Sequence, residues 1–542
     1  SQVLTRTGTS GATTWTTTIQ APSITNVTGE INEDTNTTLT VTGTNFASGM
    51  TIKLVNASSG ADITGHTTLS YTGSSSPLTV TIPSATTSLT PGLQVKLKII
   101  KSGLTATSNA ITVSEDPNWS TSAGNIATIY SSRGTSTNVG SALSATAGSG
   151  GGTINYVIDT SDTSATTYFD LGLTSGQITT DASNALSGIL GGGNGPATET
   201  FIAYAQIAGE ETTKKTPRTF NIIVNKPPTE PSSQGNSVDW TDSSGVTWRV
   251  IKFLCSSLGQ QTSLAHTWTT YASMTIDYLF IGGGGGGGDN SGAGGGGAGA
   301  FVAGTNYNLS TAGSYTINVG GGGVASRNSQ TAAGGNGSPS SLVLSGTTLI
   351  EAIGGGGAAS HNSSPAAGGS GGGASGYNSA PTSTGASPTS YVTAGNSSQA
   401  YGTSGGNGAG NYLGGGGGGA GVAGSNGGSS DYGKGGDGKA EFWGLSATQT
   451  TSMLAQIGAG VVESDNFRWL AGGGGGHQQT HTTRSAGGKG GGAQGGYYYS
   501  SSQAGGATAP SDNTGSGGGG AHNSFGISTH GAGGIVIIRY AI

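Results

Sequence analysis

The stretch "YLFIGGGGGGGDNSGAGGGGAGA" at residues 278–300 joins an apolar, strand-forming run directly to seven consecutive glycines. Glycine loses more backbone entropy on ordering than any other residue, so an ordered run of this kind needs dense compensating contacts. Runs of four or more glycines occur at 282–288, 294–297, 320–323, 354–357, 414–419, 472–476 and 517–520. Five of the seven follow a short apolar segment, so the repeating unit is an apolar strand, a glycine rod and a polar loop.

Three common interpretations of a glycine run do not fit this region. A flexible linker is short and rich in Gly and Ser, whereas this region continues to residue 542 with spaced Tyr, Trp, Ile and Val. Collagen has glycine at every third position with abundant proline, and that period is missing here. A phosphate-binding loop needs Ser or Thr after its Gly-Lys, and no Gly-Lys in this region has one.

Extended helices of the polyproline-II type can compensate the ordering cost of glycine. Such a helix has three residues per turn, so a rod without side chains can approach up to six neighbours and bond to their backbones. Any interior Cβ would force the rods apart. The positions that we predict to be structural for this reason are Gly282, Gly285, Gly288, Gly320, Gly354, Gly414, Gly472 and Gly517.

The composition narrows the classes of function. Charged residues make up 8% of the chain, against about 25% in a typical soluble domain, and the net charge is −6. This balance argues against nucleic acid as a partner, and no apolar segment reaches the ~20 residues needed for membrane insertion. The start, "SQVLTRTGTS", has no signal-peptide pattern, so we expect an extracellular structure released by lysis or a secreted protein without its leader. The single cysteine, Cys255, lies in an apolar run and is interpreted as a small buried residue.

Strand signals dominate the chain and predict an all-β fold class. Residues 24–113 are predicted to form a β-sandwich, in which 36–55, "NTTLTVTGTNFASGMTIKLV", alternates apolar and polar residues. The start "ITNVTGEI" at 24–31 and the core "VTGTNF" at 41–46 resemble the immunoglobulin-like TIG family. The strand order of 119–225 resembles cadherin-like and putative-Ig repeats. The expected organisation is an N-terminal attachment segment at 1–20, sandwiches at 21–115 and 116–227, and a glycine-rich polyglycine-II domain with short strands at 228–542. The one helix candidate, 445–461, has a weak apolar pattern.

The glycine-rich region resembles the glycine-rich domain of phage tail proteins and the distal tail-fibre adhesins of T-even-type phages. The resemblance lies in "IDYLFIGGGGGGG", in "SYTINVGGGG" and in the closing strand "GAGGIVIIRYAI" at 531–542. It implies a rigid core of rods whose connecting loops recognise the host surface. Residues 2–17 also resemble a short hairpin motif of phage fibre proteins, which implies attachment to other fibre proteins.

The loops between glycine runs carry the candidate binding residues. Tyr, Ser, Gly and Asn on a stiff scaffold form the composition of antibody paratopes. The receptor-binding candidates are Tyr377, Tyr391, Tyr401, Tyr497, Tyr498 and Tyr499. The alternative is that loop aromatics cap the open sides of the rods, and this interpretation is preferred for Phe442, Trp443, Phe467 and Trp469 because of their apolar contexts.

No pattern of residues predicts catalysis, a cofactor or a metal site. Carboxylates are sparse in the glycine-rich part, and Glu463 with Asp465 is the closest pair. The pair in "HQQTH" at 477–481 follows five glycines and has no glutamate between its histidines. The acidic stretches at 114–118 and 159–162 supply too few ligands for calcium and are interpreted as solvated turns.

These observations predict a non-enzymatic phage virion protein located on a tail fibre or another surface appendage. The expected partners are a host surface glycan or outer-membrane protein, other virion or fibre proteins bound through the N-terminal segment, and further copies of the chain. One alternative is a structural fibre or capsid-decoration protein without a specific receptor. Another is a secreted bacterial surface adhesin.

Overall fold

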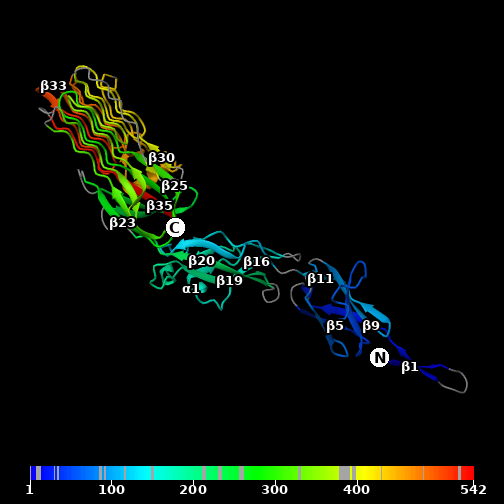
Figure 1. The fold of residues 1–542 in the computed structure, drawn as a ribbon. Coiled ribbons are helices and arrows are strands. Elements are labelled where there is room, and N and C mark those ends of the chain that lie inside the picture. Colours follow the sequence, from blue (N-terminus) through cyan, green and yellow to red (C-terminus); the bar gives the residue numbers. More distant parts are fainter. Residues whose placement is uncertain are drawn as a thin grey trace. The chain divides into compact units, whose positions relative to one another are not determined.

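The computed structural model describes residues 2–7, 14–29, 31–32, 36–84, 88–90, 93–114, 117–147, 152–209, 215–229, 235–255, 262–327, 331–377, 391–392, 398–428, 430–479, 481–522 and 526–542. The chain forms two compact units, Ser1–Asn225 and Lys226–Ile542. The fold is all-β, as predicted, with sandwiches in the first unit and packed glycine rods in the second (Figure 1).

The first unit begins with an antiparallel hairpin and then forms a β-sandwich. The hairpin pairs β1 (Gln2–Thr7) with β2 (Thr14–Ile19). One sheet of the sandwich has the order β3 (Ser23–Thr28), β5 (Thr37–Thr44), β8 (Leu78–Ile82), β7 (Tyr71–Thr72). The other sheet consists of β10 (Leu104–Thr107), β9 (Gln94–Lys101), β11 (Ile111–Ser114) and β4 (Ile31–Asn32), with β6 (Thr51–Asn56) paired to β9. Alternate residues such as Leu39, Val41, Ile52 and Leu54 fill the core between them.

The rest of the first unit is built around a four-stranded sheet. Its order is β13 (Gly124–Tyr130), β20 (Lys215–Asn225), β19 (Ala197–Ile207), β16 (Ile154–Ile158). Smaller pairings involve β14 (Asn138–Val139), β18 (Ile178–Thr180) and β17 (Phe169–Leu171), and β12 (Asn118–Trp119) with β15 (Ala145–Thr146). A short helix, α1 (Ala165–Tyr168), and a 3-10 turn, η1 (Leu186–Gly188), complete it. Trp119 packs edge-on against Phe220 in this core.

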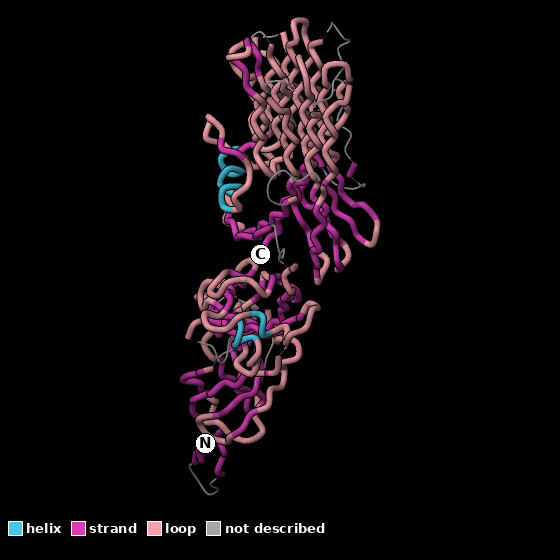
Figure 2. Tube along the Cα trace, turned by 90° about the vertical axis from the view of Figure 1, so that its left-hand side faces the viewer, coloured by secondary structure: helices cyan, strands magenta, loops and turns pink. Residues whose placement is uncertain are grey.

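The second unit contains two sheets that contact each other, and the glycine rods extend from the ends of their strands. The first sheet has the order β21 (Gly235–Thr241), β22 (Thr247–Leu254), β35 (Ile535–Ala541), β24 (Met274–Ile281), β25 (Phe301–Leu309), β30 (Ser398–Tyr401). The second has the order β23 (Leu264–Thr270), β26 (Gly313–Val319), β27 (Ser340–Leu344), β28 (Thr347–Ala352), β29 (Tyr391–Val392). Strands β24, β26 and β28 each run directly into a glycine run, and β25, β27 and β35 receive returning rods. Figure 2 shows these rods side by side beyond the strands.

The rod at 282–288 has six neighbours, the number that rods without side chains allow. Its N–H groups donate to three antiparallel rods, 293–300, 334–338 and 528–534. Its carbonyl groups accept from three parallel rods, 320–326, 354–359 and 516–521. Because the helix repeats every three residues, Gly282, Gly285 and Gly288 all donate to the same neighbour, at Ala300, Gly297 and Gly294. The set of rods is called the glycine bundle below.

The close approach of neighbouring rods explains why the eight positions predicted to be structural are glycine. A Cβ on any of the eight positions predicted from the sequence would come within 3.0 Å of a backbone carbonyl oxygen of a neighbouring segment, closer than real Cβ atoms come. None of the eight has a positive φ, so backbone freedom is not the reason for glycine there. Alanine occurs where a rod meets the apolar core next to the sheets, as at Ala298 and Ala420.

One helix, α2 (Ala447–Gln456), packs on the strand end of the second unit (Figure 2). It lies within the weak candidate at 445–461. A capping box between Ser446 and Gln449 starts it, and Met453 and Leu454 are buried in the core beneath the first sheet. The shorter strands nearby are β31 (Val461–Val462) with β32 (Arg468–Trp469), and β33 (Tyr497–Ser500) with β34 (Gln503–Gly505). Cys255 is buried as predicted, and burial raises the pKa of its thiol.

Candidate functional site

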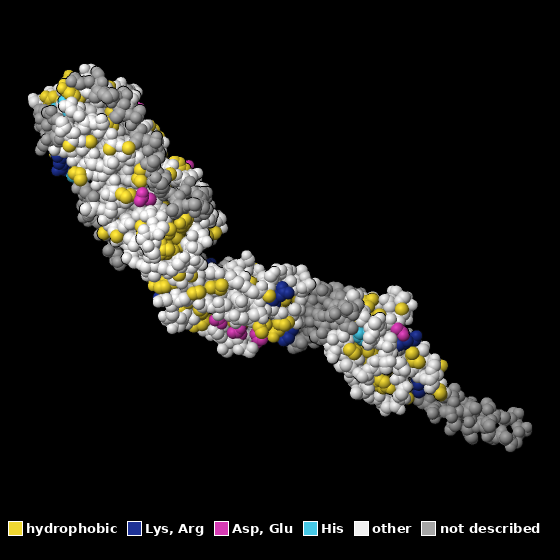
Figure 3. Space-filling model, in the orientation of Figure 1, with side chains coloured by type: hydrophobic (Ala, Val, Ile, Leu, Met, Phe, Trp, Pro, Cys, Tyr) yellow, Lys and Arg dark blue, Asp and Glu magenta, His cyan; other side chains and the backbone are white. Residues whose placement is uncertain are grey.

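The end of the glycine bundle that is remote from the sheets gathers aromatic side chains. Rods leaving the sheets reverse direction there, for example between 282–288 and 293–300. We call this end the tip and define it by the described residues of 289–293, 360–366, 375–377, 409–413, 430–433, 477–485, 496–506 and 521–527. In Figure 1, β33 marks the tip and β23, β25 and β35 mark the opposite end. On the face shown in Figure 3, uncharged atoms cover most of the described surface of this unit.

Three rings from different turns pack against one another at the tip. His361 and Tyr377 have ring centroids 3.3 Å apart, and Tyr377 lies 5.5 Å from Tyr412. A second pair, Tyr432 and His481, is separated by 4.1 Å. Tyr412 is 36% exposed and Tyr432 is 44% exposed. These rings present flat surfaces at the tip of a scaffold whose backbone is fixed by inter-rod hydrogen bonds.

A second group of rings surrounds a buried histidine. His477 has no exposed surface, and its ring lies 5.7 Å from that of His522, which in turn lies 5.4 Å from Tyr498. The Nδ1 atom of His477 accepts a hydrogen bond of 3.1 Å from the Gly292 N–H. The neutral ring therefore carries its proton on Nε2, which has no hydrogen-bond partner among the described residues. Burial and, secondly, the nearby His522 lower the pKa of His477 from 6.5 to about 3.

This pKa predicts that the glycine-rich unit loses stability in acid. Between pH 6.5 and about 3 the unfolded chain binds a proton at His477 and the folded chain does not, so the free energy of unfolding falls as the pH falls. The expected loss from this residue between pH 7.5 and 4.5 is roughly 2–3 kcal/mol. Denaturant unfolding at the two pH values measures it. His477→Asn keeps an acceptor for Gly292 and should show a smaller loss, whereas equal losses would contradict the assignment.

The structure separates the tyrosines that the sequence grouped as binding candidates. Tyr377 and the triplet Tyr497, Tyr498 and Tyr499 lie at the tip, and Tyr499 is 57% exposed. Tyr401 lies on β30 at the strand end, where it packs edge-on against Phe301 beneath the Lys439 ammonium group. The side chain of Tyr391 lies outside the described residues.

Sequence reasoning did not assign several tip residues to the binding site. These are His361, Tyr412, Tyr432, His477, His481 and His522, which come from five segments whose meeting depends on the order of the rods. For His361, Tyr412, His477 and His522, a position close to a glycine run is the feature that could have identified them. Arg484 is a further tip residue, and its guanidinium group lies 5.7 Å from the Tyr497 ring.

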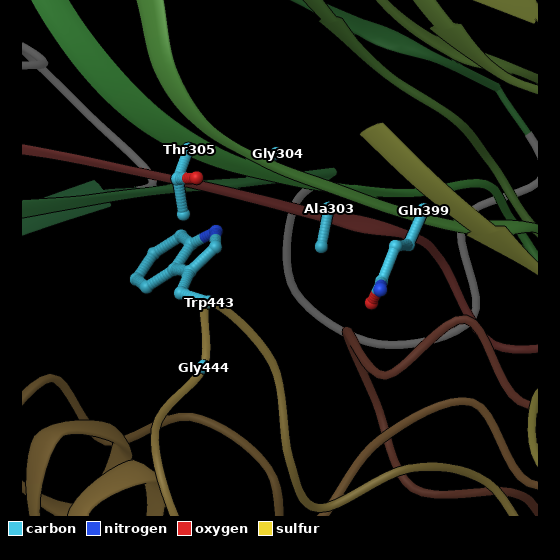
Figure 4. A pocket seen from close by; sticks show the side chains of 6 residues that line it. All are labelled: Ala303, Gly304, Thr305, Gln399, Trp443 and Gly444. Atoms are coloured by element: carbon cyan, nitrogen blue, oxygen red, sulfur yellow. The ribbon is translucent and has the colours of Figure 1, made fainter. Parts of the chain in front are cut away.

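A cavity of about 250 Å³ lies at the strand end, next to Trp443 (Figure 4). Thr305 and Gln399 line it together with the indole ring, which comes from a different segment of the chain. The Trp443 indole N–H donates to the Tyr278 carbonyl at 2.7 Å, and its ring lies 4.7 Å from the Arg539 guanidinium group. Phe442 is buried beside it. These contacts give both aromatics a packing role.

Among the described residues, no three His, Cys, Asp or Glu side chains converge as metal ligands would. Two histidines that the "HQQTH" spacing could pair, His477 and His481, instead contact different rings, His522 and Tyr432. No helix in the described part of the chain has the length and apolar character needed to cross a membrane.

Comparison with solved structures returned immunoglobulin-like and cadherin proteins at low similarity. Three examples are mouse clustered PcdhgC3 EC1-3, human Protocadherin-24 EC1-2 and the Ig1-2 module of the Drosophila receptor tyrosine phosphatase DLAR. Their identities are 15%, 12% and 10% and their TM-scores are 0.17, 0.18 and 0.14. The matches cover 38%, 37% and 38% of this chain and 68%, 100% and 100% of those chains. TM-scores this low do not establish a shared fold, so the fold is assigned from the strand pairings described above.

No curated protein matched the sequence. The family described as "Glycine-rich domain" matches residues 260–541, which include every glycine run of the bundle and the closing strand β35. This match covers more than half of the 542 residues. The protein is therefore a member of the glycine-rich domain family.

Proposed function

We propose that the chain is a non-enzymatic adhesin of a phage virion and that the tip of its glycine bundle binds the host cell surface. The observation that carries the proposal is the gathering of tyrosine and histidine rings from separate turns at one end of the bundle. Tyrosine supplies large contact area at low entropy cost, and binding hot spots are enriched in it. The hydrogen-bonded rods would hold these rings without further ordering.

The proposed receptor is an uncharged part of a host glycan or an outer-membrane protein, because the tip is rich in rings and low in charge. Other virion proteins would attach through the β1–β2 hairpin at the N-terminus. Self-association of the chain would increase avidity if several tips faced one cell. Family membership alone fits a structural fibre or capsid-decoration protein equally, and the following experiment separates the two roles.

Replacing Tyr497, Tyr498 and Tyr499 with serine should reduce cell binding by at least tenfold. Loss of one aromatic anchor costs about 2 kcal/mol, and 1.4 kcal/mol corresponds to a factor of ten. The labelled full chain is first screened against bacterial strains, and a strain that binds it is used to compare variants. Because the tip carries little charge, affinity should change little between low and high salt.

Tyr307→Ser is the matched control for the triple variant. Tyr307 is a half-buried tyrosine of the same unit, but it lies on β25 at the strand end and packs against Tyr278. We expect this variant to bind cells like the unaltered chain. Unchanged binding by a correctly folded triple variant would remove β33 from the site, and a failure of the unaltered chain to bind any strain would favour a structural role.

A further inference from the structure

A groove of about 380 Å³ lies between residues 509–512 and 527–532 of the glycine bundle, next to the tip segment that ends at Ile527. Its wall is apolar and includes Pro510, Ala532 and Ile527, whose side chain is 60% exposed. Its polar side chains include those of Arg327, Asp512 and His530. The volume falls within the range of about 300–1,000 Å³ that is usual for small-molecule sites.

Two hydrogen-bond donors face each other in this groove. The Ala325 N–H donates to the Nδ1 atom of His530 at 2.9 Å, and Nη2 of Arg327 lies 3.2 Å from the Nε2 atom of the same ring. A neutral imidazole has a single acceptor nitrogen. Ala325 is 5% exposed, so its N–H needs the acceptor, and Nδ1 must supply it. The Nε2 atom of His530 is therefore a donor, and it lies against a guanidinium group that can only donate.

An acceptor in the groove that contacts both groups would satisfy both donors. A carboxylate suits this position because arginine binds carboxylates through charge-assisted hydrogen bonds. The hydroxyl groups of Ser528 and Thr529 already donate to the carbonyl oxygens of Ser326 and Thr508, which leaves Arg327 and His530 as the side-chain donors among the described residues that line the groove.

We infer that this groove binds a sugar that carries a carboxylate, of the hexuronic acid class. The carboxylate would accept from Arg327 and from Nε2 of His530, and the apolar ring face would pack on Pro510 and Ile527. Asp512 favours a sugar over an acidic peptide, because its carboxylate can accept hydrogen bonds from the several hydroxyl groups that a sugar carries beside its carboxylate. The inference does not rest on the proposed role of the tip.

Two further cavities lie near the strand end, and in each of them a polar side chain of the lining is already hydrogen-bonded within the chain. In the cavity beside Trp443 the indole N–H already donates to Tyr278. In the groove beside α2, of about 380 Å³, Asp465 already accepts from Lys489 at 2.7 Å and from the Trp469 indole.

Calorimetric or NMR titration of the full chain with glucuronate tests the inference. Glucuronate should bind, whereas glucose, which has the same ring without the carboxylate, should bind at least about tenfold more weakly. Arg327→Gln should weaken glucuronate binding by a similar factor, as should His530→Asn, which keeps an acceptor for Ala325 but loses the Nε2 donor. Lys98→Gln, which removes the same charge from the first unit, should leave binding unchanged.

Three results would overturn the inference. One is the absence of glucuronate binding at concentrations on the order of 10 mM. A second is equal binding of glucose and glucuronate, or binding that the Arg327 variant does not weaken. The third is binding of N-acetylglutamate as tight as that of glucuronate, which would assign the groove to acidic peptides. The triple tyrosine variant of the tip should bind glucuronate normally, so failure at one site is distinguishable from failure at the other.

Discussion

Gly285→Ala is expected to lower the free energy of unfolding of the glycine-rich unit by about 4 kcal/mol or more. The added Cβ would overlap the carbonyl oxygen of Gly356 on a parallel rod. Separating these two rods would break the bond from the Gly355 N–H to the Gly283 carbonyl and the bond from the Ala358 N–H to the Gly286 carbonyl. Each buried backbone group left without a partner costs about 1–3 kcal/mol, and a central rod transmits its displacement to six neighbours.

Gly410→Ala is the matched control for this variant. Gly410 lies in a turn of the same unit, its φ is not in the left-handed region, and a Cβ there would meet no atom within 4 Å. Thermal unfolding and resistance to protease should distinguish the two variants clearly. If Gly285→Ala melted at the same temperature as Gly410→Ala, close packing of the rods would not be the reason for glycine at position 285.

The sequence was sufficient to predict the rods because the requirement for glycine is local. A strand such as 274–281 leads into seven residues without side chains, and few ordered structures can use such a run. The predicted number of neighbours is confirmed at 282–288, and the all-β fold class is confirmed for both units. The domain boundaries and the binding role of the tyrosines remain predictions.

The arrangement of the tip could not be predicted, because glycine runs carry no information about which rod lies beside which. Tyr377 and Tyr401 are close in sequence, yet one lies at the tip and the other in the sheet at the opposite end. His361 and Tyr412 meet Tyr377 only because their turns reverse at the same end of the bundle. Side chains at rod ends are therefore positioned by long-range order that a local pattern does not encode.

The helix at 447–456 was underestimated for a different reason. Its apolar pattern is short, and helices in proteins owe most of their stability to tertiary packing. Met453 and Leu454 are buried against the core formed with the first sheet, which the sequence alone does not reveal. The capping box formed by Ser446 and Gln449 was the available local signal.

Asp277→Ala is expected to lower the free energy of unfolding of the second unit by about 3–5 kcal/mol. Asp277 on β24 accepts a bond of 2.8 Å from Nε of Arg539 on β35, and both side chains are about 95% buried. The guanidinium group is enclosed by Trp248 and Trp443, at 4.1 and 4.7 Å. Without the carboxylate, this buried charge would lose its counter-ion, and the Asn306 N–H would lose its acceptor.

The pair joins strands that are 262 positions apart, so its loss weakens the contact that closes the unit. Asp239→Ala is the matched control, because Asp239 pairs with Arg249 in the same sheet but is 46% exposed, and an exposed pair contributes about 0–1 kcal/mol. The double variant Asp277→Leu with Arg539→Met removes both charges and should be more stable than Asp277→Ala, since apolar side chains often replace a buried ion pair at little cost. Denaturant unfolding of the four proteins measures these differences. If Asp277→Ala were no more destabilising than Asp239→Ala, the buried pair would not be what holds the closing strand in place.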